Sequence, residues 1–246
     1  SILNPVWPGV KQNLIYKLTP TTYTFAKGIQ VKNRLHKLWR ENRSLVFFLL
    51  LMFVFRSAVA DWNEVPTGSM KPTIIEGDRI LVNKLAYDVR VPFTHISLLK
   101  LANPARGDII IFDSAVSDKR LVKRVIGIPG DTVELIDNVL YINGEQMAYD
   151  NPVVSGNALL QEENLLGTRH QVRTHLHGSP FANFPRIEVP EGHYLAMGDN
   201  RDESADSRAI GFVPRDEIVG RSKSVVLSLN YDNYYIPRAD RFFYTL

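Results

Sequence analysis

The sequence predicts a mostly β protein: an antiparallel β-sheet or barrel domain that follows one transmembrane helix and carries an irregular inserted lobe. After residue 64 the chain is a series of short β-rich runs bounded by Gly, Pro, Asp and Asn, such as "GDIIIFDS" and "RLVKRVIGI". Upstream, residues 45–55 are continuously apolar. Residues 150–186 are instead rich in Asn, Gly, His and Pro without a sustained period, which indicates an insertion between core strands.

Composition narrows the functional classes. With 246 residues, of which 45% are hydrophobic and 22% charged, the chain can bury a core. A net charge of +3, concentrated near the N-terminus, does not indicate nucleic-acid binding. The absence of cysteine excludes disulfides, thiol catalysis and Cys-ligated zinc.

The apolar run "LVFFLLLMFVF" at residues 45–55 predicts a membrane anchor over residues 45–60, although a spanning helix needs about 20 residues. Because the run is short, the helix spans the membrane only if the Arg56 side chain extends to the membrane–water interface. Basic residues precede the run, whereas Asp61 and Glu64 follow it. By the positive-inside rule, residues 1–44 are a cytoplasmic or membrane-surface segment of otherwise unassigned role, and residues 61–246 form an extracytoplasmic domain.

The same region resembles a cleavable secretory signal, because "AVA" precedes Asp61. Against this alternative, the basic stretch begins more than 30 residues into the chain and Arg56 interrupts the apolar run. The sequence favours a retained anchor and leaves open the hypothesis that the chain is cut before Asp61.

Within the outer domain, the pair Asn143-Gly144 predicts a type I′ hairpin turn between "VLYI" and "EQMAY".

The run "VPTGSMKPT" contains a candidate nucleophile, Ser69. A serine hydroxyl is a weak nucleophile unless a neighbouring base removes its proton. Histidines cluster in "RHQVRTHLH" of the inserted lobe, where surface or structural roles are favoured and no recognised metal spacing occurs. There is also no G-x-S-x-G elbow.

A lysine is the alternative base, provided that burial lowers its pKa from about 10.4. In "RLVKRVIGIPGD" the strand alternation places Lys123 on one face with Leu121 and Val125. Lys123 is therefore the lysine expected to be desolvated. Arg124 shares the other face with apolar residues, and a buried guanidinium needs a carboxylate.

Other lysines are weaker candidates. Lys71 is only two residues from Ser69, beside a proline, and Lys84 lies in a strand whose pattern tolerates exposure. The run "SLLK", Ser97 to Lys100, matches S-x-x-K, but no S-D-N or K-T-G accompanies it.

Four blocks, "PTGSMKPT", "RGDIIIF", "KRVIGIPGD" and "GDNRDESADSR", occur in the order and with the spacing of type I signal peptidases, which the chain resembles over roughly residues 45–149 and 188–228. Members of that family are membrane-anchored Ser-Lys proteases that remove signal peptides on the outer face of the membrane. The resemblance implies a signal-peptidase-like β domain and places the chain in the cytoplasmic (inner) membrane as a single-pass protein. It implies no metal or cofactor.

The resemblance also assigns roles to individual residues. It makes Ser69 the nucleophile, Lys123 the general base, and Thr67, where serine is frequent in the family, an oxyanion donor beside the Ser69 N–H. Ser204 matches the hydroxyl that orients the lysine. Structural ion pairs are implied for Arg124 with Asp199 and for Asp206 with Arg208. Shallow apolar pockets for small side chains, at the first and third positions before the cut, are assigned to Val65, Pro66, Met70, Ile74, Leu121 and Val122.

The expected partners are preprotein signal peptides, bound by β-augmentation, and membrane lipid, with no nucleic acid. Three alternatives remain: a non-catalytic peptide-binding export factor, a specialised Ser-Lys processing protease for surface or pilin-like precursors, and a self-cleaving repressor. Intact Ser69 and Lys123 count against the first, and the anchor and the lack of a DNA-binding helix pair count against the last. Neither the substrate set nor the oligomeric state follows from the sequence.

Overall fold

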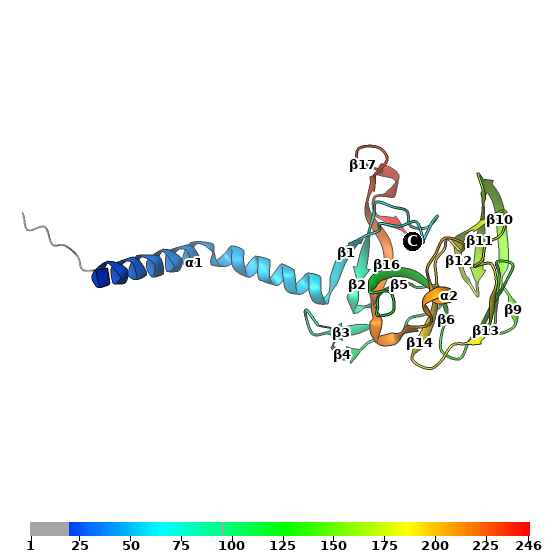
Figure 1. Cartoon of the computed structure of the whole chain (residues 1–246), viewed down its shortest axis with the longest axis horizontal. Helices are drawn as coiled ribbons and strands as arrows, with labels where there is room; N and C mark the ends of the chain where they lie inside the picture. The colour runs from blue at the N-terminus through cyan, green and yellow to red at the C-terminus, as the bar shows by residue number, and fades with distance from the viewer. Residues whose placement is uncertain (1–19, 95) are drawn as a thin grey trace, which may run out of the picture. The chain divides into compact units, whose positions relative to one another are not determined.

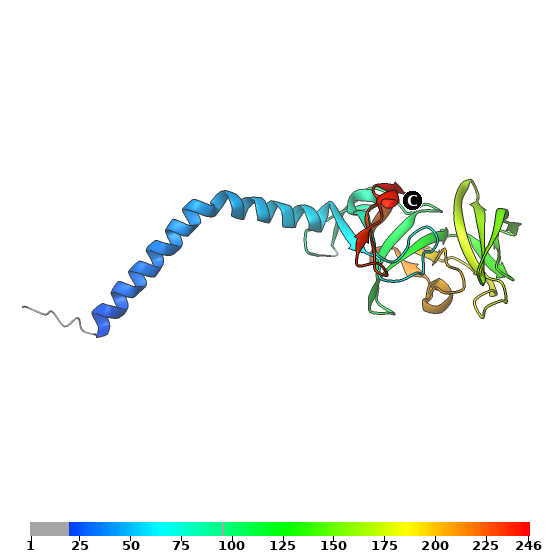
Figure 2. The same cartoon turned by 90° about the horizontal axis from the view of Figure 1, so that it is seen from above.

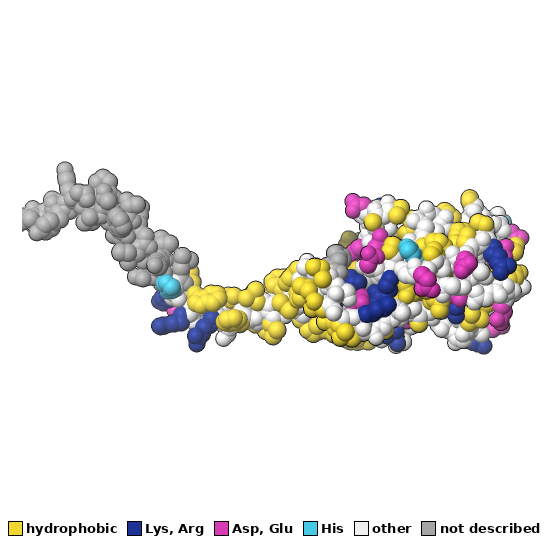
Figure 3. Space-filling view, turned by 90° about the horizontal axis from the view of Figure 1, so that it is seen from below, with side chains coloured by type: hydrophobic (Ala, Val, Ile, Leu, Met, Phe, Trp, Pro, Cys, Tyr) yellow, Lys and Arg dark blue, Asp and Glu magenta, His cyan; other side chains and the backbone are white. Residues whose placement is uncertain are grey.

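The computed structural model describes residues 20–94 and 96–246, so the first 19 residues of the predicted N-terminal segment lie outside the description. The described residues divide between Met52 and Phe53 into two units, one that holds most of a long helix and one that holds the β domain. Helix α1 spans Pro20–Ala58, and no break separates the predicted anchor from the residues before it. Figure 3 shows hydrophobic side chains along this helix. Phe48 and Leu51 of the apolar run are 60% and 69% exposed. Although the sequence predicts a spanning helix at 45–60, no helix among the described residues is long and apolar enough to cross a membrane.

The end of α1 is held by the β domain. Lys84 Nζ donates to the carbonyl oxygens of Arg56 and Ser57, at 2.8 and 3.2 Å, which satisfies acceptors that a helix C-terminus leaves free. Lys84 is therefore partly buried, and it lies in the 3₁₀ turn η1 Lys84–Ala86, not in a strand as the sequence predicts. Ala58 is helical and Ala60 pairs with Asn83, so cleavage before Asp61 requires this junction to open first.

A nine-stranded antiparallel sheet forms the body of residues 53–246 (Figure 1). Its order is β1-β2-β16-β5-β6-β14-β15, with β17 and β18 also paired to β16. The strands are β1 Ala60–Glu64, β2 Asp78–Asn83, β5 Ile109–Ser114, β6 Lys119–Gly127, β14 His193–Met197, β15 Val213–Pro214, β16 Ile218–Asn230, β17 Ile236–Pro237 and β18 Tyr244–Thr245. The predicted mostly β domain is confirmed.

Both faces of β5 are covered, which explains its uninterrupted apolar run. Ile109 and Ile111 pack with Val65, Met70 and Ile74 on one face. The alternate residues, Ile110 and Phe112, pack into a separate cluster on the other face. The period of two therefore places apolar side chains in two cores, and one of these cores lies under the segment that carries Ser69.

Smaller elements complete the domain: the sheet β13-β7-β8-β9 and the pair β3-β4. The backbone of Asn143 and Gly144 has φ of 54° and 82°, and Ile142 pairs with Glu145, which confirms the predicted hairpin turn. The remaining elements are β3 Asp88–Arg90, β4 Ser97–Lys100, β7 Thr132–Ile136, β8 Val139–Ile142, β9 Glu145–Gln146, β13 Phe184–Glu188, α2 Ser207–Ile210 and the 3₁₀ turns η1 Lys84–Ala86, η2 Arg215–Glu217 and η3 Ala239–Arg241.

The insertion at 150–186 is not irregular, and that prediction was wrong. Strands β10 Ala148–Ser155, β11 Ala158–Leu165 and β12 Thr168–His175 form a three-stranded antiparallel sheet, the inserted sheet, which stands beside the main sheet in both views (Figures 1 and 2). The buried residues of β12 do alternate, but they are His170, Val172 and Thr174. Two of these three are polar, so the alternation of burial is not an alternation of hydrophobicity.

Candidate active site

Ser69 and Lys123 come together although they are 54 positions apart: Lys123 Nζ and Ser69 Oγ are hydrogen-bonded at 2.6 Å. Ser69 lies in the turn segment between β1 and β2, where the Lys71 N–H donates to the Gly68 carbonyl and the Ile74 N–H to the Met70 carbonyl. Lys123 lies in the middle of β6. The apolar side chains of Met70 and Ile74, buried beneath the turn, present the serine toward the strand.

Burial determines the electrostatics of Lys123, which is 2% exposed. Desolvation lowers the pKa of its amine from 10.5 to about 8, while the negative charges of Asp206 and Asp199 act in the opposite direction. Among residues 20–94 and 96–246, no carboxylate lies within ion-pair distance of its Nζ. A substantial fraction of Lys123 is therefore neutral near pH 8 and able to accept a proton.

The other candidate lysines do not reach Ser69. Lys71 pairs with Glu76 at 2.7 Å, and Lys84 binds the end of α1. Ser97 and Lys100 lie on the exposed strand β4, and Ser97 donates to Asp88. Burial and contact geometry thus single out Lys123.

Asp206 and Arg208 form an ion pair whose charges act on Lys123, with Arg208 Nη2 and Asp206 Oδ2 2.8 Å apart. Asp206 also accepts the Gly198 N–H and caps α2. Burial acts to raise the pKa of Asp206, but these donors outweigh burial and hold that pKa below its usual range.

Ser204 is buried against the same segment. Its hydroxyl lies close enough to Asp206 to help lower the pKa of that carboxyl, yet it meets hydrogen-bond geometry with none of the described residues, Lys123 included. A Cβ at Gly198 would overlap both Ser204 Oγ and the Ser69 carbonyl, so this close approach requires glycine. The expected contact between Ser204 and the lysine is thus not made in this structure.

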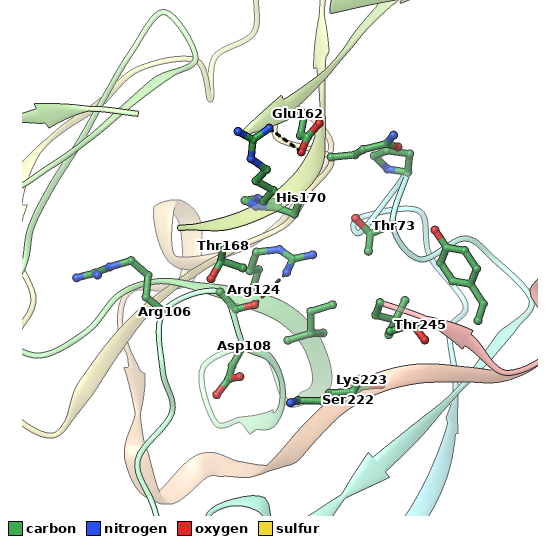
Figure 4. Close-up of a pocket in the computed structure, with 17 residues that line it drawn as sticks. Thr73, Arg106, Asp108, Arg124, Glu162, Thr168, His170, Ser222, Lys223 and Thr245 are labelled. Atoms are coloured by element: carbon green, nitrogen blue, oxygen red, sulfur yellow. Dashed lines mark hydrogen bonds and ion pairs between the residues drawn. The ribbon is translucent and has the colours of Figure 1, made fainter. Parts of the chain in front are cut away.

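Arg124 faces away from Ser69 into a second cavity of about 630 Å³, shown in Figure 4. Its Nε and Nη2 donate to Asp199 at 2.9 and 2.8 Å, and its Nη1 donates to the Gly107 carbonyl. Thr73 Oγ1 donates to Asp199 at 2.6 Å. Burial acts to raise the pKa of the Asp199 carboxyl, but the charge and hydrogen bonds of Arg124 outweigh burial and hold that pKa below its usual range.

The sequence reasoning missed a buried cluster behind this pair. Arg201 and Glu163 form an ion pair, and His170 Nε2 lies 3.3 Å from Glu163 Oε2. Tyr149 donates to Glu163 at 2.6 Å. Despite complete burial, the Arg201 guanidinium and the hydrogen-bonding approach of His170 keep the pKa of the Glu163 carboxyl far below its usual range. Arg201 lies within "GDNRDESADSR" and is the one signal that pointed here.

A groove of about 570 Å³ runs past Ser69 and Lys123. Between Lys119 and Lys123, β6 pairs with β5 alone, and β1 pairs with β2 alone, so the described residues leave one strand edge free on each side. Of the predicted substrate-binding residues and Thr67, those that line it are Val65, Pro66, Thr67, Met70, Leu121 and Val122.

Ile74 does not line the groove, contrary to expectation. Its side chain is fully buried beneath the turn, where it supports Ser69 from the core side. The groove instead continues to Arg56, Trp62 and Arg120. The Arg56 guanidinium is paired with Asp61 and stacks over the Trp62 ring at 4.1 Å.

Among the described residues, no cluster of three or more His, Asp or Glu could hold a metal ion. What the arrangement offers is a serine hydroxyl beside a desolvated amine, in a groove bounded by free strand edges. Such a pair is one of the variants of nucleophilic serine catalysis.

Comparison with known proteins agrees with this class. The family described as signal peptidase, peptidase S26, matches residues 38–227. Signal peptidase I of Pseudomonas fluorescens is 38% identical over 199 residues, 73% of this chain and 69% of the relative. The enzyme of that name from Pseudomonas aeruginosa is 36% identical over 196 residues, with the same coverage of 73% and 69%. A solved signal peptidase I from Enterococcus faecalis V583 aligns with 36% identity and a TM-score of 0.33, covering 50% of this chain and 98% of that chain. The chain belongs to the signal peptidase family, peptidase S26.

Proposed function

We propose that this protein is a serine endopeptidase that removes N-terminal signal peptides from exported preproteins, cutting after small residues in the pattern Ala-x-Ala. Family membership and relatives named signal peptidase I support the class of reaction. The observation that carries the mechanism is the 2.6 Å contact between Ser69 Oγ and the Nζ of a lysine whose pKa is lowered to about 8.

In the proposed reaction, neutral Lys123 accepts the Ser69 proton as Oγ attacks the carbonyl carbon of the scissile peptide. The oxyanion is stabilised by the Ser69 backbone N–H and the Thr67 hydroxyl. Protonated Lys123 then gives its proton to the departing amine, which leaves an acyl-enzyme ester at Ser69. Lys123 next activates a water, which hydrolyses the ester and restores the serine.

The groove suits an extended substrate. A peptide strand laid between β1 and β6 can bond to free backbone groups on both sides, which is largely independent of side-chain identity. Selection then rests on the groove floor, where we assign Val65, Met70 and Leu121 among the residues that accept small side chains.

We further propose that α1 contacts lipid through its exposed apolar residues 45–55. Lys37, Arg40 and Arg43 precede this run and Asp61 follows it. The positive-inside rule then puts residues 1–44 on the cytoplasmic side of the inner membrane and the domain 61–246 on the other side. Protease added outside spheroplasts should digest the β domain; protection of that domain would reverse the orientation.

The test is precursor cleavage on membranes that carry the full chain. Ser69→Ala and Lys123→Met should each lower kcat by roughly 10⁴-fold or more, because each removes half of one catalytic unit. The matched control is Lys71→Met, which removes a nearby lysine paired with Glu76 and should keep activity near wild type. Cleavage by either dyad variant at close to the wild-type rate would refute the mechanism.

Wild-type binding of precursors without cleavage would favour the non-catalytic export factor instead. A panel of exported, surface and pilin-like precursors separates general from specialised processing, because a specialised enzyme cleaves only one group.

A further inference from the structure

The Ser69 backbone N–H belongs to the peptide unit whose carbonyl is that of Gly68. This peptide is trans. A trans peptide is planar, and its N–H and C=O point in opposite directions, so whatever holds the Gly68 carbonyl also aims the Ser69 N–H. Within residues 20–94 and 96–246, no acceptor is found for this N–H, as a donor reserved for an oxyanion requires.

Asn200 donates hydrogen bonds to two successive carbonyls of the turn segment, those of Gly68 and Ser69. Its side-chain Nδ2 donates to the Gly68 carbonyl at 3.0 Å, and its backbone N–H donates to the Ser69 carbonyl at 3.1 Å. Asn200 is itself 0% exposed. The Gly68 carbonyl accepts a second bond from the Lys71 N–H at 3.0 Å, so both of its lone pairs are engaged.

The inserted sheet fixes which end of the Asn200 amide faces Gly68. Arg173 of β12 donates through Nη1 to Asn200 Oδ1 at 3.1 Å. The Nδ2 of Asn200 also donates to the Glu203 carboxylate at 2.9 Å. A reversed amide would set its oxygen against the Gly68 carbonyl and the Glu203 carboxylate, and its NH₂ against a guanidinium. The backbone of Arg173 also bonds to Asp199 and Arg201 on either side of Asn200, at 2.8 and 2.9 Å.

We propose that Asn200 is a positioning residue for peptide hydrolysis: braced by Arg173, it holds the Gly68–Ser69 peptide so that the Ser69 N–H points to the developing oxyanion. The proposal rests on the proposed function. It gives the inserted sheet a part in catalysis without any contact with substrate.

The experiment compares full-length wild type, Asn200→Ala and Asn200→Asp in precursor cleavage near pH 9, where Lys123 is mostly neutral. In Asn200→Ala kcat should fall about tenfold, less than the ~10²–10³ for outright loss of an oxyanion donor, because Lys71 still holds the Gly68 carbonyl. In Asn200→Asp a carboxylate opposes that carbonyl, and the fall should be about 10²-fold. KM should stay within about twofold, because the oxyanion forms only in the transition state.

Three further variants separate positioning from folding. Asn143→Ala is the control. It removes comparable hydrogen bonds of a side-chain amide, from the Thr132 N–H and to Asp131, in a hairpin outside the groove, and it should leave kcat unchanged. Arg173→Met removes the brace together with the contact of Arg173 to Glu203, and it should lower kcat by less than Asn200→Ala, with KM unchanged, whereas Arg173→Lys should recover part of the loss. Equal losses of kcat in the Asn143 and Asn200 variants would overturn the proposal.

A second readout does not depend on activity. The Ser69 amide resonance, recorded in ¹⁵N-serine-labelled protein and assigned by its loss in Ser69→Ala, should shift in Asn200→Ala and stay in place in Asn143→Ala. An unchanged resonance, or a shift with unchanged kcat, overturns the proposal. If wild type cleaves no precursor while the resonance shifts as expected, it is the proposed function that fails and not the hold of Asn200 on the peptide.

Discussion

Lys123 and Arg124 are neighbours on β6, both are cationic, and both are buried, at 2% and 4% exposed. Arg124 points to one side of the strand, where Asp199 and the Gly107 carbonyl satisfy its guanidinium. Lys123 points to the other side, where its single hydrogen-bond partner among the described residues is the Ser69 hydroxyl. Two adjacent buried cations therefore have opposite surroundings.

The difference shows that burial alone does not make a base. A buried cation with a carboxylate keeps its proton and becomes part of the framework. A buried amine without one loses much of its preference for the charged form, as the lowered pKa of Lys123 indicates. Because side chains alternate along a strand, Arg124 and Lys123 face different environments. Asp199 lies within ion-pair distance of Arg124 and not of Lys123.

Breaking the Arg124 pair should have the largest effect on stability. Asp199→Ala leaves a buried guanidinium without its carboxylate and should lower the free energy of unfolding by about 3–5 kcal/mol. Thermal or denaturant unfolding measures this. The control is Arg169→Ala, since the Arg169 side chain is 59% exposed and its pairs should contribute less than about 1 kcal/mol. Equal effects of the two substitutions would show that Asp199 is not needed to compensate Arg124.

Removing the uncompensated amine should act in the opposite direction. Below pH 8 Lys123 is charged in both folded and unfolded states, so folding carries the full cost of its lowered pKa, on the order of 3 kcal/mol. Between about pH 8 and 10.5 the unfolded chain binds more protons, so wild-type stability rises with pH. Lys123→Met should therefore be more stable than wild type at pH 7, by up to about 3 kcal/mol, and the gap should close toward pH 10.5. A less stable variant at pH 7 would contradict the desolvation of Lys123.

The pH dependence of cleavage tests the difference between Lys123 and Arg124 without any substitution. Because Lys123, the proposed base, must be neutral to accept a proton, kcat/KM should rise about tenfold per pH unit below pH 8 and level off above it. If Lys123 were paired as Arg124 is, the rise would continue beyond pH 10. A plateau already reached at pH 6 would argue for a different base.

Local patterns carried much of the fold prediction. The alternation in β6 and the Asn143-Gly144 turn depend on neighbouring residues, and both could be recognised from them. The inserted sheet could not, because His170 and Thr174 fill buried positions that hydrophobic patterning assigns to apolar residues. The neighbours of these positions are polar as well: His170 Nε2 lies 3.3 Å from Glu163, its cross-strand partner on β11, and 3.9 Å from Asp199, which lies outside the inserted sheet.

By itself, the sequence determined strands of the main sheet, the family and the identity of Ser69 and Lys123 as candidates, since these depend on residue type, order and spacing. Only the tertiary structure decided that the two meet at 2.6 Å, that Ser204 has no hydrogen-bond partner among the described residues, and that Asn200 holds the Gly68 carbonyl. The physical reason is that each of these contacts depends on distances and directions between distant segments. Core packing and strand register set those distances, and no local pattern encodes them.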